Sequence, residues 1–299
     1  MVVVLSIVFM LMRLLPVETY YGGRSDTMSE AVKEQVLKSL GLLDPLPVQL
    51  MNFWKSLLRG DLGKSIVYRK GVGNIDIIIP KAIYSSRFGI ASLAISLVVG
   101  LALGVLMATY KGRGLDKIGN GYILLINALP AAVYYLSIQL GLTSLLKIPM
   151  LFHPTDPKTW ILPVISMSLG GIASNAMWMR RYMVDQLNQD YIRLAKAKGM
   201  SSTQVAFRHI LRNAFIPMSQ SLPTSILFAI SGSLYIESLY SIPGMGGLLI
   251  TAIQRQDNTL VQAMVLLYSA LSVLGMLLGD LLMIVVDPRI KLVKQGGVR

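Results

Sequence analysis

The segment Gly60-Asp61-Leu62-Gly63-Lys64-Ser65 contains residue types that could bind phosphate, because it ends in the glycine, lysine and serine of a phosphate-binding loop. Such a loop also needs a glycine five residues before Gly63, and Leu58 stands at that position. The strand and helix pattern of a parallel sheet does not surround the segment. We therefore predict a turn here rather than a nucleotide site.

Catalytic and metal-binding residue types are scarce in this chain. It has no cysteine and only 2 histidines, which removes disulfide frameworks, thiolate metal sites and cysteine nucleophiles. The Gly-x-Ser-x-Gly pattern of a serine nucleophile is also absent from the sequence. We predict that the chain is not an enzyme and holds no metal or cofactor of its own.

A polar, positively charged segment at residues 180–217, called here the basic loop, lies between two apolar stretches. Gly199 suits the left-handed residue just past a helix end, and Ser201 with Gln204 fits a capping box that starts a second helix. Two short helices at an angle would form a rigid projection that another protein could push. The charged residues of the loop are Arg180, Arg181, Arg193, Lys196, Lys198, Arg208 and Arg212, against Asp185 and Asp190.

The composition indicates a membrane protein. The 299 residues are 54% hydrophobic and 14% charged, where a soluble domain usually has about 25% charged residues. The net charge of +13 fits either nucleic-acid binding or the excess of Lys and Arg beside an anionic cytoplasmic leaflet. The basic residues lie between apolar stretches, so the membrane interpretation is favoured and no nucleic-acid partner is expected.

Apolar stretches predict an all-α, polytopic fold with six transmembrane helices. A span needs about 20 apolar residues, and residues 2–15 form a shorter stretch without the basic start or small-residue cleavage site of a signal peptide. We interpret it as an uncleaved first span. We expect two domains, 1–87 (first helix and an outer cap) and 88–299 (a transmembrane core). The other predicted spans are residues 88–110, 122–142, 160–178, 221–239 and 261–286.

Loop charges predict the orientation of these spans. Basic residues gather after the second, fourth and sixth spans, which places those loops and both termini in the cytoplasm. Residues 16–87, called here the cap, would then fold outside the membrane. His153 and His209 fall on opposite sides, so a two-histidine metal site is not predicted.

Polar residues inside apolar spans are costly and usually face a protein or watery interior. We expect Pro130 and Pro223 to loosen or kink their spans and Gly100 with Gly104 to mark a close helix contact. Asp280 is expected to pair with Arg180 or Arg181, and a substrate contact is the second interpretation. The candidates for a translocation path are Asn127, Gln139, Ser174, Asn175, Ser231 and Ser233.

The residues Pro243, Gly244, Met245 and Gly246, called here the gate segment, give a strong turn signal before an apolar stretch. Two alternatives stay open. The segment re-enters the bundle and closes the outer mouth of a path, or it is an ordinary turn. Glu237, just before it, is expected to reach the outer interface.

Four landmarks in order resemble the membrane permease subunits of binding-protein-dependent ABC importers, over nearly the whole chain. Within that family the oligopeptide, dipeptide and nickel permeases are most similar, on the side of the first of the paired peptide permease subunits. The landmarks are Arg13-Leu14-Leu15-Pro16, Gly60-Asp61-Leu62-Gly63-Lys64-Ser65, the basic loop and Asp287-Pro288-Arg289-Ile290.

The resemblance implies that the basic loop contacts an ATPase subunit. Arg193 departs from the family pattern, because a glutamate gives that loop its name, while Ala195 and Gly199 match. The residues implied in ATPase coupling are Arg193, Ala195, Lys196, Ala197, Lys198, Gly199, Met200 and Ser201.

The resemblance also implies partners, cargo and location. The partners would be a second homologous permease, two cytoplasmic ATPases that bind ATP and Mg, and an extracytoplasmic binding protein, in a bacterial or archaeal cell membrane. The chain would form half of the path for oligopeptides or dipeptides. A nickel or metal-chelate permease remains a second interpretation, and a channel or ion-driven carrier a third of a different class.

Overall fold

The computed structural model describes residues 2–14, 16–21, 28–187 and 189–286. Within these residues the regular structure is helical, apart from one isolated bridge between Lys64 and Gly73. The chain divides into two compact units, one of residues 1–87 with 230–274 and the other of residues 88–229 with 275–299. The all-α fold predicted from the apolar pattern is confirmed.

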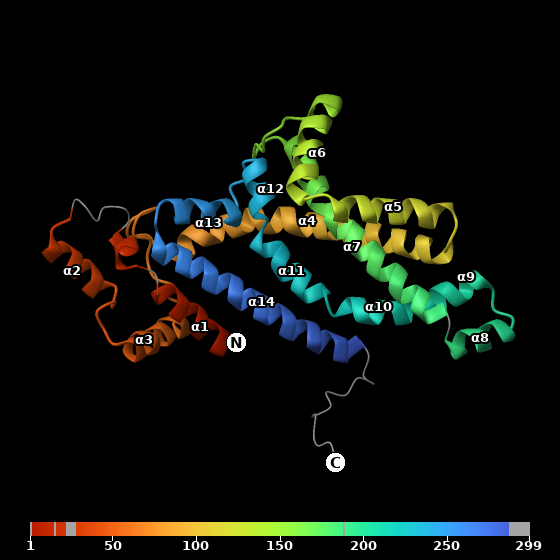
Figure 1. Cartoon of the computed structure of the whole chain (residues 1–299), viewed down its shortest axis with the longest axis horizontal. Coiled ribbons are helices and arrows are strands. Elements are labelled where there is room, and N and C mark those ends of the chain that lie inside the picture. The colour runs from red at the N-terminus through yellow and green to blue at the C-terminus, as the bar shows by residue number, and fades with distance from the viewer. Residues whose placement is uncertain (1, 15, 22–27, 188, 287–299) are drawn as a thin grey trace, which may run out of the picture. The chain divides into compact units, whose positions relative to one another are not determined.

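Four helical segments are long and apolar enough to cross a membrane. They are α4 (Asn74–Thr109), η3 with α7 (157–187), α11 with α12 (222–239) and α14 (Asn258–Val286), and the bent pair α5–α6 can count as a fifth (Figure 1). The first predicted span, α1 (Val2–Arg13), has 12 residues, fewer than the roughly 20 that a span needs. The six-span count therefore stays a prediction.

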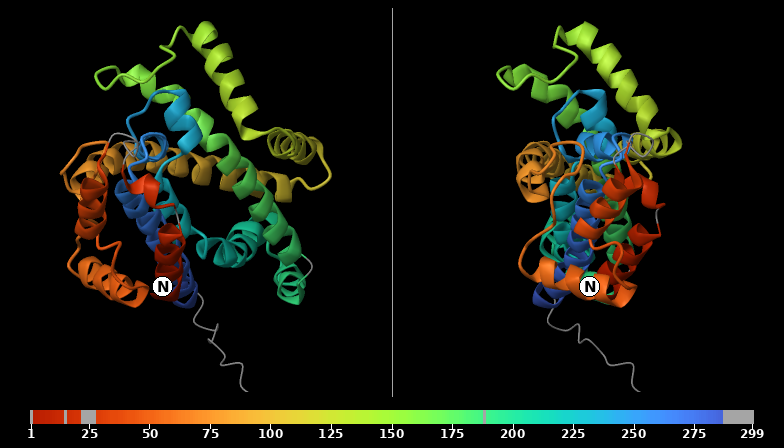
Figure 2. Two further views of the ribbon diagram at one scale, coloured as in Figure 1. Left: turned by 60° about the vertical axis from the view of Figure 1, so that its left-hand side comes forward. Right: turned by 90° about the vertical axis from the view of Figure 1, so that its left-hand side faces the viewer.

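The first unit contains the helices of the predicted cap and a core of α4, α13 and α14 residues. Helix α1 contacts α3 through stacked rings of Phe9 and Phe53, whose centroids lie 4.4 Å apart. Figure 2 shows these N-terminal helices, in red and orange, from two further sides. The remaining elements of the unit are η1 (Val17–Tyr21), α2 (Glu30–Ser39), α3 (Leu46–Leu58), α12 (Leu234–Leu239) and α13 (Met245–Gln254).

The second unit is built around α7, which packs against α4, α5, α6 and α10. The predicted small-residue contact is confirmed. A Cβ on Gly100 would lie 2.7 Å from Asn175 Cβ and one on Gly104 would lie 2.7 Å from Ala176 O, so only glycine allows α4 this close to α7. The elements are α5 (Gly114–Ala128), α6 (Ala131–Leu146), η3 (Pro157–Trp160), α7 (Ile161–Leu187), α8 (Asp190–Ala197), α9 (Ser202–Val205), the π-helical turn η4 (Ala206–Ile210), α10 (Leu211–Ser219) and α11 (Leu222–Ser231).

Two predicted spans are broken, for different reasons. Between α5 and α6 the axis turns by 107°, because Pro130 lacks an N–H and Leu129 before it is extended. The predicted effect of Pro130 is thus confirmed. Pro223 instead lies in the first turn of α11, where proline is tolerated. The break within residues 222–239 falls at Gly232, which has a φ of +79°.

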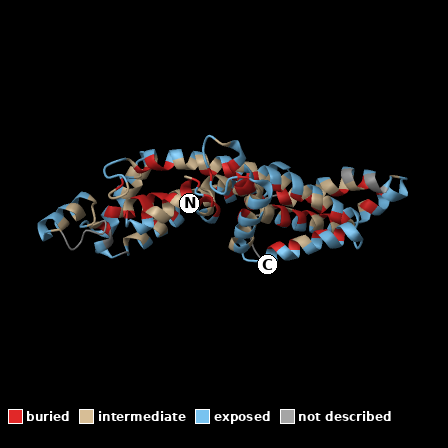
Figure 3. Ribbon diagram, turned by 90° about the horizontal axis from the view of Figure 1, so that it is seen from above, coloured by how far each residue is buried: buried red, intermediate tan, exposed pale blue. Residues whose placement is uncertain are grey.

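Large apolar side chains remain exposed along the long helices. Val98, Leu124 and Val285 are each more than 70% exposed, and Figure 3 shows buried and exposed positions alternating along the helices. Exposed apolar surface of this extent marks contact with a membrane or with another protein.

Candidate functional site

The basic loop folds as the sequence predicts. Helix α8 ends at Ala197, and Gly199 follows with a φ of +81°. The Ser201 N–H donates to Gln204 Oε1 (3.0 Å), and the Gln204 N–H donates to Ser201 Oγ (3.3 Å), which is the reciprocal pair of a capping box. The two helices α8 and α9 are therefore joined by a fixed turn.

Helix α8 has one buried face and one charged face. Ile192 and Ala195 are buried in a core that includes Met179 and Met183 of α7 and Val205 of α9. Helix α8 is therefore packed directly against the long helix α7. The exposed residues on the other side are Arg193, Leu194, Lys196, Ala197 and Lys198, with Gly199 and Ser201 exposed in the turn and Met200 half-buried against the same core.

Polar bonds fix α8 to its neighbours as well. The Tyr191 hydroxyl donates to Gln186 Oε1 of α7 (2.5 Å) and accepts from Asn213 Nδ2 of α10 (3.0 Å). By contrast, the exposed pair Arg193–Asp190 is separated by 3.4 Å. Exposed pairs of this kind contribute little to stability, so the surface charges remain available to a partner.

The base of the basic loop is fixed by an ion pair that sequence reasoning missed. Arg180 donates from Nε to Asp116 Oδ1 (2.6 Å) and from a terminal nitrogen to Asp116 Oδ2 (2.9 Å), and the buried Asp116 also accepts from the Gly112 N–H. Of the two partners expected for Asp280, Arg180 pairs with Asp116 instead, and Asp280 accepts from Gln220 Nε2 at 3.0 Å, with no ion pair to Arg181 among the described residues. The two carboxylate oxygens of Asp116 accept from two nitrogens of one guanidinium, and such a bidentate contact is stronger than a single hydrogen bond.

The candidate path residues do not form one cluster. Asn127 on α5 and Ser174 on α7 are exposed, whereas the Asn175 amide donates to the Ser96 carbonyl of α4 (3.1 Å) and the buried Gln139 amide donates to the Met150 carbonyl (3.3 Å). These four lie in the second unit. Ser231 and Ser233 belong to the first unit and flank the break at Gly232.

The gate segment is buried and leads into a helix. Gly244, Met245 and Gly246 are buried, Pro243 is half-buried, and α13 begins at Met245. A turn at Ser241, which has a φ of +55°, precedes the segment, so both alternatives stay open. That the segment closes a path stays a prediction.

Glu237 holds the N-terminus of α13 rather than reaching an interface. The residue is 2% exposed, so the expectation that its carboxylate reaches the outer interface is wrong. Its Oε1 accepts from the Ser85 hydroxyl (2.6 Å) and its Oε2 accepts from the Gly246 N–H (2.6 Å). Ser85 Oγ in turn accepts from the Met245 N–H at 2.8 Å. A carboxylate at a helix N-terminus accepts hydrogen bonds from N–H groups that have no partner within the helix, and its charge interacts favourably with the helix dipole.

Ser65, the last residue of the phosphate-loop-like segment, and the three residues after it bind a carboxylate of the chain itself. The Ser65 hydroxyl donates to Asp257 Oδ2 (2.5 Å), as do the N–H groups of Val67 (3.0 Å) and Tyr68 (2.7 Å), and the Ile66 N–H donates to Oδ1 (3.2 Å). We call residues 65–68 around this carboxylate the cradle. Successive N–H groups of a turn form such anion-binding concavities.

The environment of Asp257 favours its charged form. The carboxylate is fully buried, and burial alone would raise its pKa. The hydrogen bonds from Ser65 and the backbone N–H groups of Tyr68, Val67 and Ile66 outweigh burial and hold the pKa of Asp257 below its usual 3.8. Asp257 therefore carries its charge at neutral pH inside the protein.

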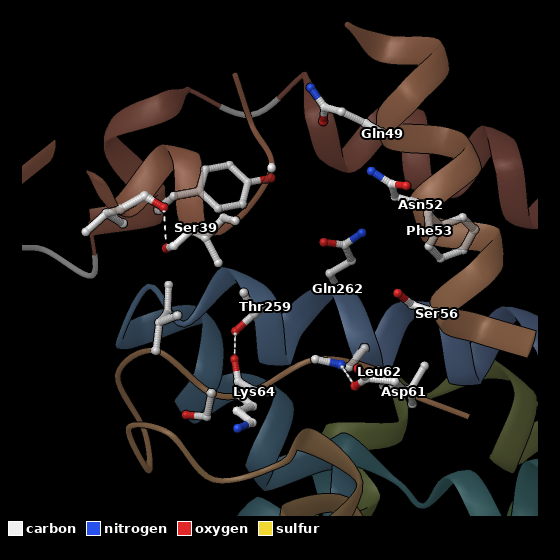
Figure 4. A pocket seen from close by; sticks show the side chains of 18 of the residues that line it. Ser39, Gln49, Asn52, Phe53, Ser56, Asp61, Leu62, Lys64, Thr259 and Gln262 are labelled. Carbon is white, nitrogen blue, oxygen red and sulfur yellow. Dashed lines mark hydrogen bonds between the residues drawn. The ribbon is translucent and has the colours of Figure 1, made fainter. Parts of the chain in front are cut away.

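A cavity of about 770 Å³ lies beside the cradle in the first unit (Figure 4). That volume is in the range of small-molecule sites. Gln49, which is 8% exposed, lines it and donates to the Leu42 and Asp44 carbonyls, while its Oε1 has no hydrogen-bond partner. Within the described residues, no group of three or more His, Cys, Asp or Glu side chains could hold a metal ion.

Solved structures define the class of fold. The methionine ABC transporter MetNI in an inward-facing form matches with a TM-score of 0.57 at 14% identity, covering 71% of this chain and 97% of that chain. An amino acid ABC transporter matches with a TM-score of 0.54 at 16% identity, covering 72% and 94%. At these identities the likeness shows a shared fold.

Sequence relatives define the family. Residues 100–292 match the family model described as "Binding-protein-dependent transport system inner membrane component". The dipeptide permease DppB of Bacillus subtilis is 31% identical over 98% of this chain and 94% of its own length, and the glutathione permease GsiC of Pectobacterium atrosepticum is 31% identical over 97% and 94%. The chain belongs to this family and is a multi-pass membrane protein.

A longer relative matches as well. The oligopeptide permease AmiC of Streptococcus pneumoniae is 34% identical over 223 residues, which are 73% of this chain. This chain spans 44% of the length of AmiC. The landmark Asp287-Pro288-Arg289-Ile290 lies outside the described residues.

Proposed function

We propose that this chain is the membrane permease subunit of an ATP-driven importer and forms half of a path for oligopeptides or dipeptides. The observation that carries the proposal is the α8–Gly199–α9 turn, whose buried face is fixed to α7 and whose basic face is exposed. A second, homologous permease would complete the path. Two cytoplasmic ATPases would bind ATP and Mg, and a binding protein would deliver cargo from outside.

The mechanism follows from how α8 is attached. ATP binding draws the two ATPases together, and the ATPase that holds α8 displaces it. Because α8 and α7 share an apolar core, α7 moves with α8, so closure of the ATPases alters the path between the helices. Transport requires that nucleotide and binding protein each favour one of the two states of the permease.

The predicted orientation puts the basic loop and both termini in the cytoplasm and the cap outside. Because the chain has no cysteine, single cysteines report the side of the membrane without background. We expect Lys70→Cys in the cap to react with an impermeant maleimide in intact cells. Lys198→Cys should react only after the membrane is opened, and equal labelling of both in intact cells would overturn the topology.

The ATPase contact is tested by reversing charge on the exposed face of α8. We expect Lys196→Glu with Lys198→Glu to abolish co-purification of the ATPases and ATP-driven peptide uptake. Lys158→Glu, which reverses one exposed charge in η3, should change neither. Normal uptake by the double variant would refute the contact.

The cargo is tested by competition between substrates for uptake into vesicles that contain the importer. DppB, AmiC and GsiC are named for dipeptide, oligopeptide and glutathione transport. We expect unlabelled dipeptides or tripeptides to compete with a labelled tripeptide for uptake. Competition by a nickel chelate, with none by peptides, would assign a metal-chelate cargo.

A further inference from the structure

Helix α13 is held at both ends by buried carboxylates of the first unit. At its N-terminus, Glu237 of α12 and Ser85 of α4 bind the N–H groups of Met245 and Gly246. Just past its C-terminus, Asp257 occupies the cradle. Each carboxylate thus meets one serine hydroxyl and one or more backbone N–H groups, and each links α13 to a different segment.

The middle of α13 is also packed. Met245 and Ala252 are fully buried, and they share a core with Ile77 and Ile78 of α4 and with Leu260 of α14. Close-packed cores resist deformation and transmit displacement. Since both ends are bonded and the middle is packed, α13 moves as one rigid piece with the segments that its ends bind.

The cradle belongs to an exposed, positively charged loop. Lys64, Arg69 and Lys70 are exposed on the same loop whose backbone binds Asp257. The loop is joined to α14 by the bond from the Thr259 hydroxyl to the Lys64 carbonyl (2.7 Å), and the Arg255 guanidinium lies 5.4 Å from the Tyr68 ring. The surface charge of this loop fits an acidic partner surface.

We propose that α13 is a rigid link, fastened by Asp257 and Glu237, through which an acidic face of the binding protein on the loop 64–70 controls the position of α12. This inference rests on the proposed function. Docking on Lys64, Arg69 and Lys70 displaces the cradle, Asp257 carries that displacement to α13, and Glu237 carries it to α12. Helix α12 follows the break at Gly232, beside the path candidates Ser231 and Ser233.

The test uses the complete importer, with both permeases and both ATPases, and its binding protein loaded with trialanine. The measurement is ATP hydrolysis against binding-protein concentration. Coupling free energies between sites are usually worth about 5- to 150-fold. We expect Asp257→Asn and Glu237→Gln to lower the maximal stimulation about five-fold or more, while the subunits still co-purify. Asp44→Asn, an exposed carboxylate of the cap, should leave stimulation unchanged.

Charge reversal on the loop separates docking from transmission. Lys64→Glu with Lys70→Glu should raise the concentration of binding protein needed for half-maximal stimulation about five-fold or more, with the maximum retained. The lysine variants should thus change the half-maximal concentration, and the carboxylate variants should change the maximal stimulation. This difference is not expected if Asp257 only stabilises the fold.

A covalent link provides a second test if Asp257→Asn fails to assemble. The pair Ser65→Cys with Asp257→Cys places two thiols where the hydroxyl and carboxylate now bond. Oxidation joins the two thiols as a disulfide, with the two electrons and two protons passing to an added copper–phenanthroline and oxygen mixture. We expect the oxidised complex to be stimulated and the reduced complex, equally assembled, to lose stimulation.

The outcomes distinguish the two proposals. If the wild-type complex is not stimulated by the loaded binding protein, the proposed function is wrong. If the wild type is stimulated and Asp257→Asn, Glu237→Gln and the reduced cysteine pair are stimulated equally, the link through α13 is wrong.

Discussion

The basic loop and α13 show two ways of holding a short helix in a membrane protein. Both helices pack in an apolar core, but α8 leaves its charges exposed, whereas α13 is also held at its ends by buried carboxylates and has little exposed charge. Exposed charges can form ion pairs with a partner protein at little cost to the stability of the chain. Buried carboxylates are fixed, because separating them from their donors is costly. The exposed charges of α8 are therefore suited to binding a partner. The buried carboxylates at the ends of α13 are suited to transmitting displacement.

The largest expected effect is the loss of the cradle's carboxylate. Asp257→Ala leaves the Ser65 hydroxyl and four N–H groups, those of residues 66–68 and of Leu260, without this acceptor. We expect the free energy of unfolding to fall by about 4 kcal/mol, since each buried donor left without an acceptor costs about 1–3 kcal/mol. Thermal unfolding in detergent measures this. The matched change Asp44→Ala, at an exposed carboxylate of the same unit, should have no measurable effect. Equal destabilisation by the two substitutions would show that the buried carboxylate contributes no more to stability than an exposed one.

A smaller loss is expected at the base of the basic loop. Asp116→Ala leaves the partly buried Arg180 without its bidentate partner. We expect about 3 kcal/mol of destabilisation, because removing one member of a buried pair leaves an uncompensated charge. The control Asp190→Ala removes the partner of Arg193 from an exposed pair and should not change the unfolding temperature. If the two variants unfold alike, burial does not govern these charges.

Acid should weaken the cradle in a defined direction. The folded pKa of Asp257 lies below its usual 3.8, so its contribution is complete above pH about 4 and is lost as pH falls through the folded pKa. The difference in unfolding temperature between wild type and Asp257→Asn should therefore be larger at pH 7 than at pH 3. A difference that is the same at both values would contradict this assignment.

The smallest expected effect is at the capping box. Ser201→Ala removes one partner of the reciprocal pair with Gln204 and should destabilise the start of α9 by about 1 kcal/mol. Amide hydrogen exchange of residues 202–205 should speed up about five-fold, while exchange in α13 stays unchanged. Unaltered exchange in α9 would show that the tertiary core alone holds that helix.

Local features of the fold could be predicted from the sequence. The glycine stop at Gly199, the capping box and the break at Pro130 each depend on residues within a few positions of one another. The start of α4 could not be predicted in this way. Its first four turns contain Lys81 and Arg87, which interrupt the apolar pattern but not the helix.

The contacts that hold α13 could not be predicted, because they join distant positions. Ser65 and Asp257 are 192 positions apart, and Ser85 and Glu237 are 152 apart. The sequence predicts a turn near Ser65 and contains an aspartate before α14, but nothing in a single sequence pairs them. Asp116 was missed for the same reason, since its partner Arg180 is 64 positions away.

The most direct test of the central claim is ATP-driven tripeptide uptake by vesicles that contain the complete importer with either wild-type chain or Gly199→Pro. Gly199 has a φ of +81°, and proline is fixed near −65°, so the substitution changes the turn between α8 and α9 without touching the long helices. We predict uptake by the wild type, none by Gly199→Pro and none by vesicles holding this chain alone. Normal uptake by Gly199→Pro, or uptake by the chain alone, would contradict the account.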